Sequence, residues 1–375
     1  MNKRLIVGSI ACFALTSIVG CGPAAVIEDL RTLGGIASIG LGINKHGNVV
    51  GGSYVAGGNP HVAGLHAFRW VEGLGMVDLG ALPGGNVAEG QGINSSGLVV
   101  GGSHASVEGD VVTHAFLATA NGALIDLGTM GDPGDFSYAW DVNDRGQVTG
   151  EAVVRHGAEG GNAHAFVWTS ASGMKDVGTL GGTSSVGRAI NDSGQVAGES
   201  KTSSGSTIAF RFTTGAGLVG LGTLGGSKSS AYGINEGGEV VGESETGFVV
   251  KGNALFTSLT LFGTHAFRWR VGSGMMDLGH LGGGFSSARA INNKGVIVGI
   301  GSLVGGELRA FRWTNAGGMI DLNTLLPSNS GWILTEAYDV NDAGQVTGAG
   351  YHNGRRRAFR LNPPASVTES EEVKK

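Results

Sequence analysis

Cysteine is nearly absent from this chain of 375 residues, which contains only Cys12 and Cys21. Both lie ahead of the repeated part of the sequence, so the repeated part has no cysteine that could form a disulfide. Exported domains often depend on disulfides for stability. Without them, we expect this chain to depend on its hydrophobic core and on the closure of its repeats into a ring.

Charge is also scarce, with 25 Lys and Arg against 30 Asp and Glu. A protein that binds nucleic acid carries its basic residues in a cluster on one face. The only dense basic run here is Arg355–Arg357, which we interpret as a solvated loop beside the last strand. We therefore predict no nucleic-acid partner.

The apolar run near the N-terminus, Leu5–Gly20, is too short for a membrane-spanning helix, which takes about 20 residues. It follows Lys3 and Arg4, an arrangement typical of a secretory signal peptide. The run ends in Ile18-Val19-Gly20-Cys21, which looks like a bacterial lipobox, in which the cysteine is lipidated and becomes the mature N-terminus. The alternative is an ordinary signal peptide with an incidental cysteine.

We accordingly predict a lipoprotein signal peptide over 1–20 and a tether over 21–25 that is lipidated at Cys21. The lipid would make the membrane a partner of the protein. Gly22, rather than an aspartate, follows the cysteine. By resemblance to Gram-negative lipoproteins, this favours the outer membrane, facing either the periplasm or the cell surface.

Glycine, by contrast, is abundant, with 72 residues against a usual share of about 7%. The glycines recur within a segment that occurs seven times and reads roughly A-x-x-I-N-x-x-G-x-V-V-G, a variable gap, H-A-F-R-W, a turn and D-L-G. A period of this size indicates a propeller, a solenoid or an array. We call the asparagine of each copy its anchor, and the anchors are Asn44, Asn94, Asn143, Asn191, Asn235, Asn292 and Asn341.

Each repeat contains four short segments with the composition of β-strands. In the sixth copy these segments are 287–292, 296–299, 309–313 and 319–322. Four hairpin-linked strands match one blade of a β-propeller, so seven copies predict an all-β, seven-bladed propeller with four-stranded antiparallel blades. A parallel β-helix is the alternative, but its coils are usually shorter and lack three tight hairpins each. We place the propeller at 26–362 and expect a disordered tail over 363–375.

Two glycines keep fixed places relative to every anchor. One follows the anchor by three residues, in a turn where glycine tolerates a positive φ. The other follows it by seven residues, inside the second strand. A strand glycine that is present in every copy implies a bulge or the close approach of another backbone segment.

The two ends of the repeat array complete each other. The seventh copy stops after its third strand, at 357–361, whereas a segment that matches a fourth strand, 26–35, precedes the first anchor. We predict that residues 26–30 pair with 357–361 and close the last blade. This pairing would leave no open sheet edge at the seam of the ring.

The signature His-Ala-Phe-Arg-Trp at 66–70 and 265–269 recurs together with Gly-Ile-Asn and Asp-Leu-Gly-Thr-Leu-Gly-Gly. With these motifs the chain resembles the HAF-repeat family of probable extracellular repeat proteins, over roughly residues 26–361. The histidine is lost at 208–210, 309–311 and 357–359, where the chain departs from the pattern. The resemblance implies an exported bacterial repeat protein and implies no reaction.

Four histidines occupy one position of the third strand, and repeat symmetry would spread them around the ring. They cannot converge on a metal ion, which needs three or four ligands around one point, so we expect each imidazole to bond locally across its blade. We interpret the recurring aspartates as turn or strand caps. No calcium loop, nucleophile elbow or phosphate-binding loop is present, and we predict no metal, no cofactor and no catalytic residue. The histidines are His66, His114, His164 and His265.

Function in a repeat scaffold is expected where the copies differ. They differ in the gap between the second and third strands and at the position three residues before each anchor. If the first strand is innermost, the latter side chains surround the mouth of the channel. Aromatic rings stack on apolar ligand faces and arginines bind carboxylates, so we predict a site for a glycan or a peptide, with packing between blades as the alternative. After Leu41 in the first copy, the candidate ligand-binding residues are Gln91, Trp140, Arg188, Tyr232, Arg289 and Tyr338.

Three functions remain open at this stage. We favour a membrane-anchored recognition scaffold without enzymatic activity. A propeller enzyme that acts on an extracellular polysaccharide is the second, and it would need acids that break the repeat pattern near the axis. A purely structural envelope protein is the third. The acids that come closest to the enzyme requirement are Asp132, Asp135, Asp141, Glu336 and Asp339.

Overall fold

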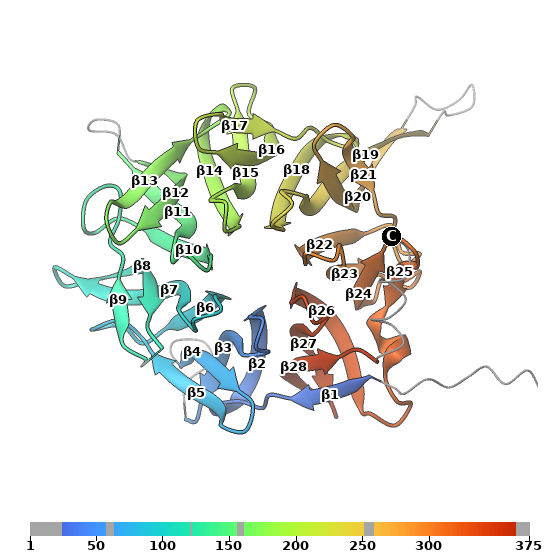
Figure 1. Ribbon diagram of the computed structural model, residues 1–375, viewed down its shortest axis with the longest axis horizontal. Coiled ribbons are helices and arrows are strands. Elements are labelled where there is room, and N and C mark those ends of the chain that lie inside the picture. Colours follow the sequence, from blue (N-terminus) through green and yellow to red (C-terminus); the bar gives the residue numbers. More distant parts are fainter. Residues whose placement is uncertain (1–24, 58–63, 121, 156–160, 251–258, 365–375) are drawn as a thin grey trace, which may run out of the picture.

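A computed structural model describes residues 25–57, 64–120, 122–155, 161–250 and 259–364. The described chain forms seven separate four-stranded antiparallel sheets, arranged as blades around a central channel (Figure 1). The predicted seven-bladed β-propeller is thereby confirmed, and the β-helix alternative is wrong. The predicted signal peptide and Cys21 lie outside the described residues, as does the predicted tail from residue 365 onward.

The strands follow one order in every blade, from the channel outward. Blade 1 holds β2 (Gly34–Ile43), β3 (Val49–Val55), β4 (Leu65–Val71) and β5 (Gly75–Gly80); blade 2 holds β6 (Ala88–Ile93), β7 (Val99–Val107), β8 (Asp110–Ala118) and β9 (Leu124–Asp126); blade 3 holds β10 (Ser137–Val142), β11 (Val148–Val154), β12 (Asn162–Thr169) and β13 (Gly173–Gly178); blade 4 holds β14 (Gly181–Ile190), β15 (Val196–Thr202), β16 (Thr207–Thr213) and β17 (Gly217–Gly220).

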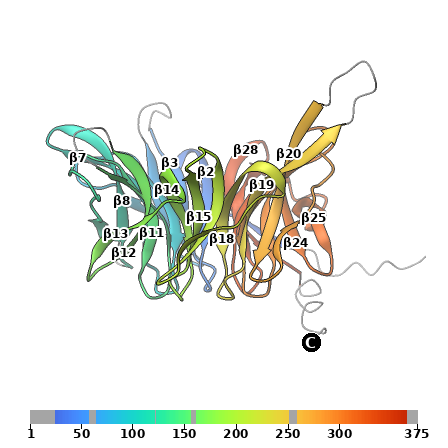
Figure 2. The ribbon, with the colours of Figure 1, turned by 90° about the horizontal axis from the view of Figure 1, so that it is seen from above.

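The remaining blades continue this order. Blade 5 holds β18 (Gly225–Ile234), β19 (Val240–Val250), β20 (Leu259–Arg270) and β21 (Gly274–Asp277); blade 6 holds β22 (Ser286–Ile291), β23 (Ile297–Ser302), β24 (Leu308–Thr314) and β25 (Gly318–Asp321), followed by the 3-10 helix η1 (Leu322–Leu325); blade 7 holds β26 (Trp332–Val340), β27 (Val346–His352), β28 (Arg355–Asn362) and, from the other end of the chain, β1 (Val26–Asp29). In side view, β19 and β20 project beyond the body of the ring (Figure 2).

The N-terminal strand closes the last blade, as the sequence predicts. β1 pairs antiparallel with β28, from Val26 opposite Asn362 to Asp29 opposite Phe359, and the Leu30 amide donates to the Ala358 carbonyl at 3.0 Å. The paired span is thus 26–29 with 359–362, slightly shifted from the predicted one. Ala25 is already buried and bonded to Leu325, so the folded part includes the last residue of the predicted tether.

The interpretation of Arg355–Arg357 as a loop is wrong, because all three residues belong to β28. β28 pairs antiparallel with β27, and these residues lie opposite Gly350–His352. Arg356 forms an ion pair with Glu336 at 2.6 Å, and Arg357 donates to the Ile36 carbonyl at 2.9 Å. A run of charges within one segment does not reveal that the segment is a strand.

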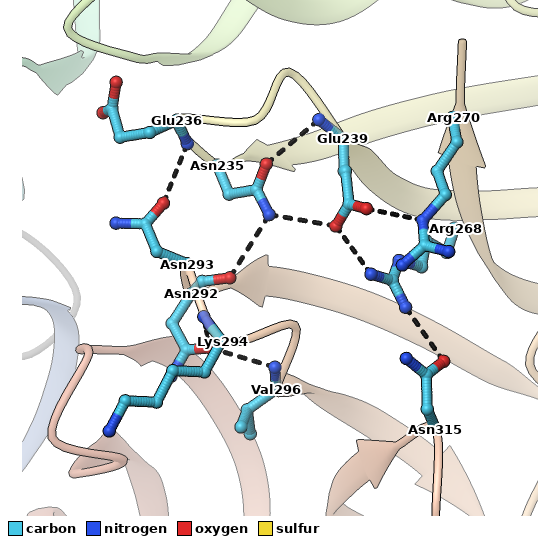
Figure 3. A network of polar contacts seen from close by, with 10 residues as sticks. All are labelled: Asn235, Glu236, Glu239, Arg268, Arg270, Asn292, Asn293, Lys294, Val296 and Asn315. Atoms are coloured by element: carbon cyan, nitrogen blue, oxygen red, sulfur yellow. Dashed lines mark hydrogen bonds and ion pairs between the residues drawn. The ribbon is translucent and has the colours of Figure 1, made fainter. Parts of the chain in front are cut away.

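The anchor asparagines form a closed ring of hydrogen bonds. Each buried anchor accepts the backbone N–H of the fourth residue after it, which fixes its own turn. Each also donates through its amide nitrogen to the backbone carbonyl of the anchor in the next blade, at 2.9–3.3 Å, and Asn341 donates back to Asn44. Figure 3 shows the link from Asn235 to Asn292. The recurrent asparagine therefore joins every pair of neighbouring blades.

The arginine and tryptophan of the third-strand signature also join neighbouring blades. Arg360 stacks on Trp70 of the next blade, 4.6 Å from the ring centroid, and donates to the carbonyl of the turn residue Gly47. Arg211 repeats both contacts, with Trp269 and Gly238. A guanidinium suits this place because it can stack on a ring and donate in its plane at the same time. The phenylalanine of the same signature is fully buried in all seven blades.

Candidate ligand-binding site

The second invariant glycine determines the shape of the inner strands. In every blade, a Cβ at this position would lie 1.9–2.0 Å from a backbone oxygen of the inner strand, so only glycine fits. Opposite it, the inner strand has a register shift that leaves one residue unpaired, a β-bulge. Bulges re-aim side chains, and they often occur beside functional sites. The predicted close approach is confirmed.

The unpaired residue of each bulge is the one three places before the anchor. All seven of these side chains are partly exposed, between neighbours on the strand that are mostly buried. They line one cavity of about 520 Å³ in the channel, which we call the channel cavity. Its variable members are the six candidate residues Gln91, Trp140, Arg188, Tyr232, Arg289 and Tyr338, with Leu41 from blade 1. The structure therefore brings the predicted set together, in the second half of each inner strand.

The candidate side chains also contact one another between blades. Arg188 stacks on Trp140, 4.1 Å from the ring centroid, and Arg289 stacks on Tyr232 at 4.4 Å. Gln91 donates to the Tyr138 hydroxyl at 2.8 Å. Lining a cavity and packing between blades are thus combined in the same residues. Each stacked ring has one face covered by a guanidinium, and these contacts hold the rings in place.

A shell of glutamates around the candidates was not predicted from the sequence. Glu199 accepts from Arg188 at 2.9 Å, Glu243 accepts from the Tyr232 hydroxyl at 3.1 Å, and Glu151 accepts from the Trp140 indole at 3.3 Å. These three occupy the second strand, eight residues after their anchors. The residue at this position differs between copies. This variation could have identified the position as part of the site, as it did for the bulge residues. Glu199 and Glu243 also line a second cavity, of about 420 Å³, between blades 4 and 5.

Three further acids line the channel cavity itself. Asp141 accepts the backbone N–H groups of Val142 and Ile190, and Asp339 accepts those of Val340 and Ile43. Loss of water around these carboxyl groups raises the pKa of Asp141 to about 6 and that of Asp339 to about 7. Burial also raises the pKa of Glu89, against hydrogen bonds from Tyr138 and Gln91.

The other acids proposed for an enzyme are held in ion pairs. Asp135 is buried, binds Arg155 and accepts the backbone N–H of Asp132. The hydrogen bond from Arg155 holds the pKa of Asp135 below its usual value, even though burial acts in the opposite direction. Asp132 also pairs with Arg155, at 3.2 Å. Neither aspartate lines the channel cavity.

The repeated histidines bond within their own blades, as expected. In blades 1 to 3 and in blade 5, the imidazole Nδ1 contacts the aspartate twelve residues later at 2.8–3.0 Å. The same aspartates accept the backbone N–H two residues further on, so their predicted role as caps is confirmed. His352 makes the equivalent contact with Asp29 across the seam. Within the described ranges, no group of three or more acidic, histidine or cysteine side chains is arranged to hold a metal ion.

The raised pKa values of Asp141 and Asp339 predict a pH-dependent stability. Between about pH 4 and pH 7 the folded chain keeps protons that the unfolded chain releases, so its free energy of unfolding falls as the pH rises through this window. Alanine already occupies the equivalent position at Ala189 and Ala290, so we expect Asp141→Ala/Asp339→Ala to fold. The melting temperature of this variant should change less between pH 4 and pH 7 than that of the wild type.

The control for this measurement is Asp110→Ala, which removes an exposed carboxylate far along a hairpin from the channel. It should leave the pH dependence as it is in the wild type. Equal slopes for the double variant and the wild type would contradict the assignment of the raised values to this pair.

Comparisons with known proteins find similar solved structures and no family. No family model matches the chain, and no curated protein matches its sequence. Among solved structures, TolB from Acinetobacter baumannii is similar, with a TM-score of 0.40 and 11% identity over 66% of this chain and 59% of that one. The chain thus spans about three fifths of that structure's length. No helix within the described residues is long and apolar enough to cross a membrane.

Proposed function

We propose that this protein is an exported, membrane-anchored recognition scaffold that binds a surface glycan or a peptide in the channel cavity. One observation carries the proposal. The bulge residues differ between otherwise similar repeats, and all seven line the same cavity of about 520 Å³. A cavity of this size, lined by rings and a few polar groups, is typical of a site for a small molecule or for the end of a glycan or peptide chain. The resemblance to the HAF-repeat family forms part of the same proposal.

A glycan is our first choice of ligand. Trp140, Tyr232 and Tyr338 offer ring surface, and Gln91 offers an amide beside the Glu89 carboxylate. Sugars present apolar ring faces together with many hydroxyls, which can both donate and accept. The carboxyl groups of Glu89, Asp141 and Asp339, which line the cavity, can accept hydrogen bonds from such hydroxyls, and the rings can stack on the apolar faces. A peptide with an acidic residue would use the arginines instead, and it is the second choice.

The test is binding to purified full-length protein in detergent, measured against arrays of glycans and of peptides. We expect Trp140→Ala/Tyr232→Ala to weaken binding at least tenfold, because it removes two rings from the cavity wall. Tyr351→Ala is the control, since Tyr351 is exposed on β27 outside the cavity. Its affinity should match the wild type. Unchanged affinity in the double variant would contradict the proposed site. So would a double variant that unfolds while the wild type binds no glycan or peptide on the arrays.

The membrane anchor is tested separately. We propose that Cys21 carries the lipid, because it ends the apolar segment at the place where cleavage is expected. Cys21→Ser is expected to abolish lipidation and release the protein from the outer-membrane fraction. Cys12→Ser, inside the apolar segment, is the control and should leave the protein in the membrane. A Cys21→Ser protein that is still processed and membrane-bound contradicts the anchor.

A polysaccharide-cleaving enzyme is the second candidate. The observation that favours it is the raised pKa of Asp141 and Asp339 in the channel cavity, since perturbed values often mark catalytic acids. Both carboxylates are occupied by backbone N–H groups of neighbouring blades, which supports a structural role. Product release from a bound polysaccharide, lost in Asp141→Ala/Asp339→Ala, would favour the enzyme over the scaffold.

A further inference from the structure

Two arginines occupy the same bulge position in different blades, and within the described residues only one of them is paired with a carboxylate. Arg188, in blade 4, stacks on Trp140 and forms an ion pair with Glu199 of its own blade at 2.9 Å. Arg289, in blade 6, stacks on Tyr232, but it has no hydrogen bond or ion pair with any residue that the structure describes. The positive charge of Arg188 is therefore paired with a carboxylate of the protein, whereas that of Arg289 is not paired with any described residue.

A single difference between the blades accounts for this. The partner of Arg188 lies eight residues after the anchor of blade 4, and the equivalent residue of blade 6 is the buried Ile300. Glu199 and Ile300 hold equivalent register positions, opposite Val186 and Ser287 of their inner strands. Blade 6 thus provides an aliphatic side chain where blade 4 provides a carboxylate.

Arg289 lines the channel cavity. Its Nε is shielded from solvent and has no hydrogen-bond partner in the described parts of the chain. Its Nη groups are not shielded in this way, and the residue lines the channel cavity. The two nearest bulge residues are tyrosines, Tyr232 in blade 5 and Tyr338 in blade 7. Their hydroxyls are directed to Glu243 and Glu336, so neither satisfies the guanidinium.

We infer that Arg289 is the anion anchor of the channel cavity and that the ligand is a sugar bearing one carboxylate, such as a uronic acid unit. This rests on the proposed function. A guanidinium presents a planar fork of N–H donors that matches a carboxylate in bidentate fashion. The tyrosine ring beneath it holds the fork in place. The carboxylate that Glu199 supplies in blade 4 would come from the ligand in blade 6.

The charges of the cavity wall restrict the ligand to one negative group. Three carboxyl groups, Glu89, Asp141 and Asp339, line the cavity together with only two guanidinium groups. One of these guanidinium groups is already paired. A polysulfated or phosphorylated ligand would find a single unpaired guanidinium among the described residues that line the cavity. A neutral, hydroxyl-rich body with one carboxylate fits, because its hydroxyls can donate to the remaining acids.

The experiment compares a glucuronate-containing oligosaccharide with a glucose-containing one of the same length and linkage. Binding to the full-length protein is measured by calorimetry. The wild type is expected to bind the glucuronate probe at least tenfold more tightly. Arg289→Gln should reduce this preference to about twofold or less. Arg289→Lys should retain part of it, because the charge remains but the fork is lost.

Two matched variants separate this role from general effects of charge. Arg188→Gln/Glu199→Gln removes the paired arginine together with its partner. Because Arg188 also lines the cavity, we expect both probes to bind more weakly by a similar factor, so that the glucuronate preference stays within twofold of the wild type. Ile300→Glu supplies Arg289 with the carboxylate that blade 4 already has, and it should abolish the preference while leaving glucose binding unchanged. Melting temperatures establish that each variant is folded, and Arg289→Gln decides alone if Ile300→Glu does not fold.

Different results overturn different claims. A glucuronate preference that persists in Arg289→Gln, or that is lost equally in the Arg188 variant, rejects Arg289 as the anchor. Equal binding of both probes by the wild type also rejects Arg289 as the carboxylate-binding residue, but it does not contradict the proposed glycan-binding function. If the wild type binds neither probe, both the proposed glycan ligand and the role of Arg289 are rejected.

Discussion

Deletion of residues 25–30 is expected to unfold the whole propeller rather than to shorten one blade. The deletion removes β1, which pairs with β28 over four residues, and it removes Leu30, which is 1% exposed. It also removes Glu28 and Asp29, the partners of Arg360 and His352 across the seam. Repeat folds gain stability from the interfaces between neighbours, so an opened seam weakens the entire ring.

We expect the melting temperature of this deletion variant to fall by roughly 10 °C or more, if it folds at all. Two point variants refine the measurement. Leu30→Ala removes a buried side chain and should cost about 2–4 kcal/mol of unfolding free energy. Val26→Ala, at a side chain that is 60% exposed in the same closing segment, should cost much less. A deletion variant with the melting temperature of the wild type would show that β1 does not close the ring.

Much of this architecture was readable from the sequence, because the repeat determines it seven times. The anchors gave the number of blades, and the missing fourth strand of the last copy gave the closure at 26–30. The Asn-x-x-Gly turn was also predictable, since its glycine has a positive φ in every copy. What the sequence did not reveal is that the anchors also bond to each other. A contact from Asn341 to Asn44 depends on the curvature of the closed ring, which no local pattern contains.

The candidate site was partly predictable for a similar reason. Variation three residues before the anchor pointed to the correct side chains, because positions that serve only the fold stay constant between copies. The partners with which those side chains form hydrogen bonds and ion pairs were not predictable. Arg188 and Arg289 occupy one repeat position, yet among the residues that the structure describes only Arg188 has a carboxylate partner, and the residue that decides this lies on the next strand. The pairing of strands at a bulge has to be known before Glu199 and Ile300 can be compared.

The bulge links the fold to the site, and Gly150→Ala is expected to disrupt both. A Cβ on Gly150 would lie 1.9 Å from the Tyr138 carbonyl oxygen and 2.8 Å from the Phe166 ring. The first neighbour is backbone and the second is fully buried, so neither can move aside easily. Such overpacking typically costs about 1–3 kcal/mol, and we expect the upper end of that range or more here.

Relief of this clash requires the inner strand to move, and Trp140 is the unpaired residue of that bulge. We therefore expect Gly150→Ala to lower the melting temperature and also to shift the Trp140 fluorescence in the protein that remains folded. Because the chain has six tryptophans, this signal is taken as the difference from a matched protein that carries Trp140→Phe. Gly134→Ala is the matched control, because it lies in the same repeat, has no positive φ and would place its Cβ in open space. A lower melting temperature without any change in the Trp140 fluorescence would show that the glycine stabilises the fold but does not position the Trp140 side chain. Both changes, with the control unchanged, would show that the invariant glycine holds the variable side chain in the channel.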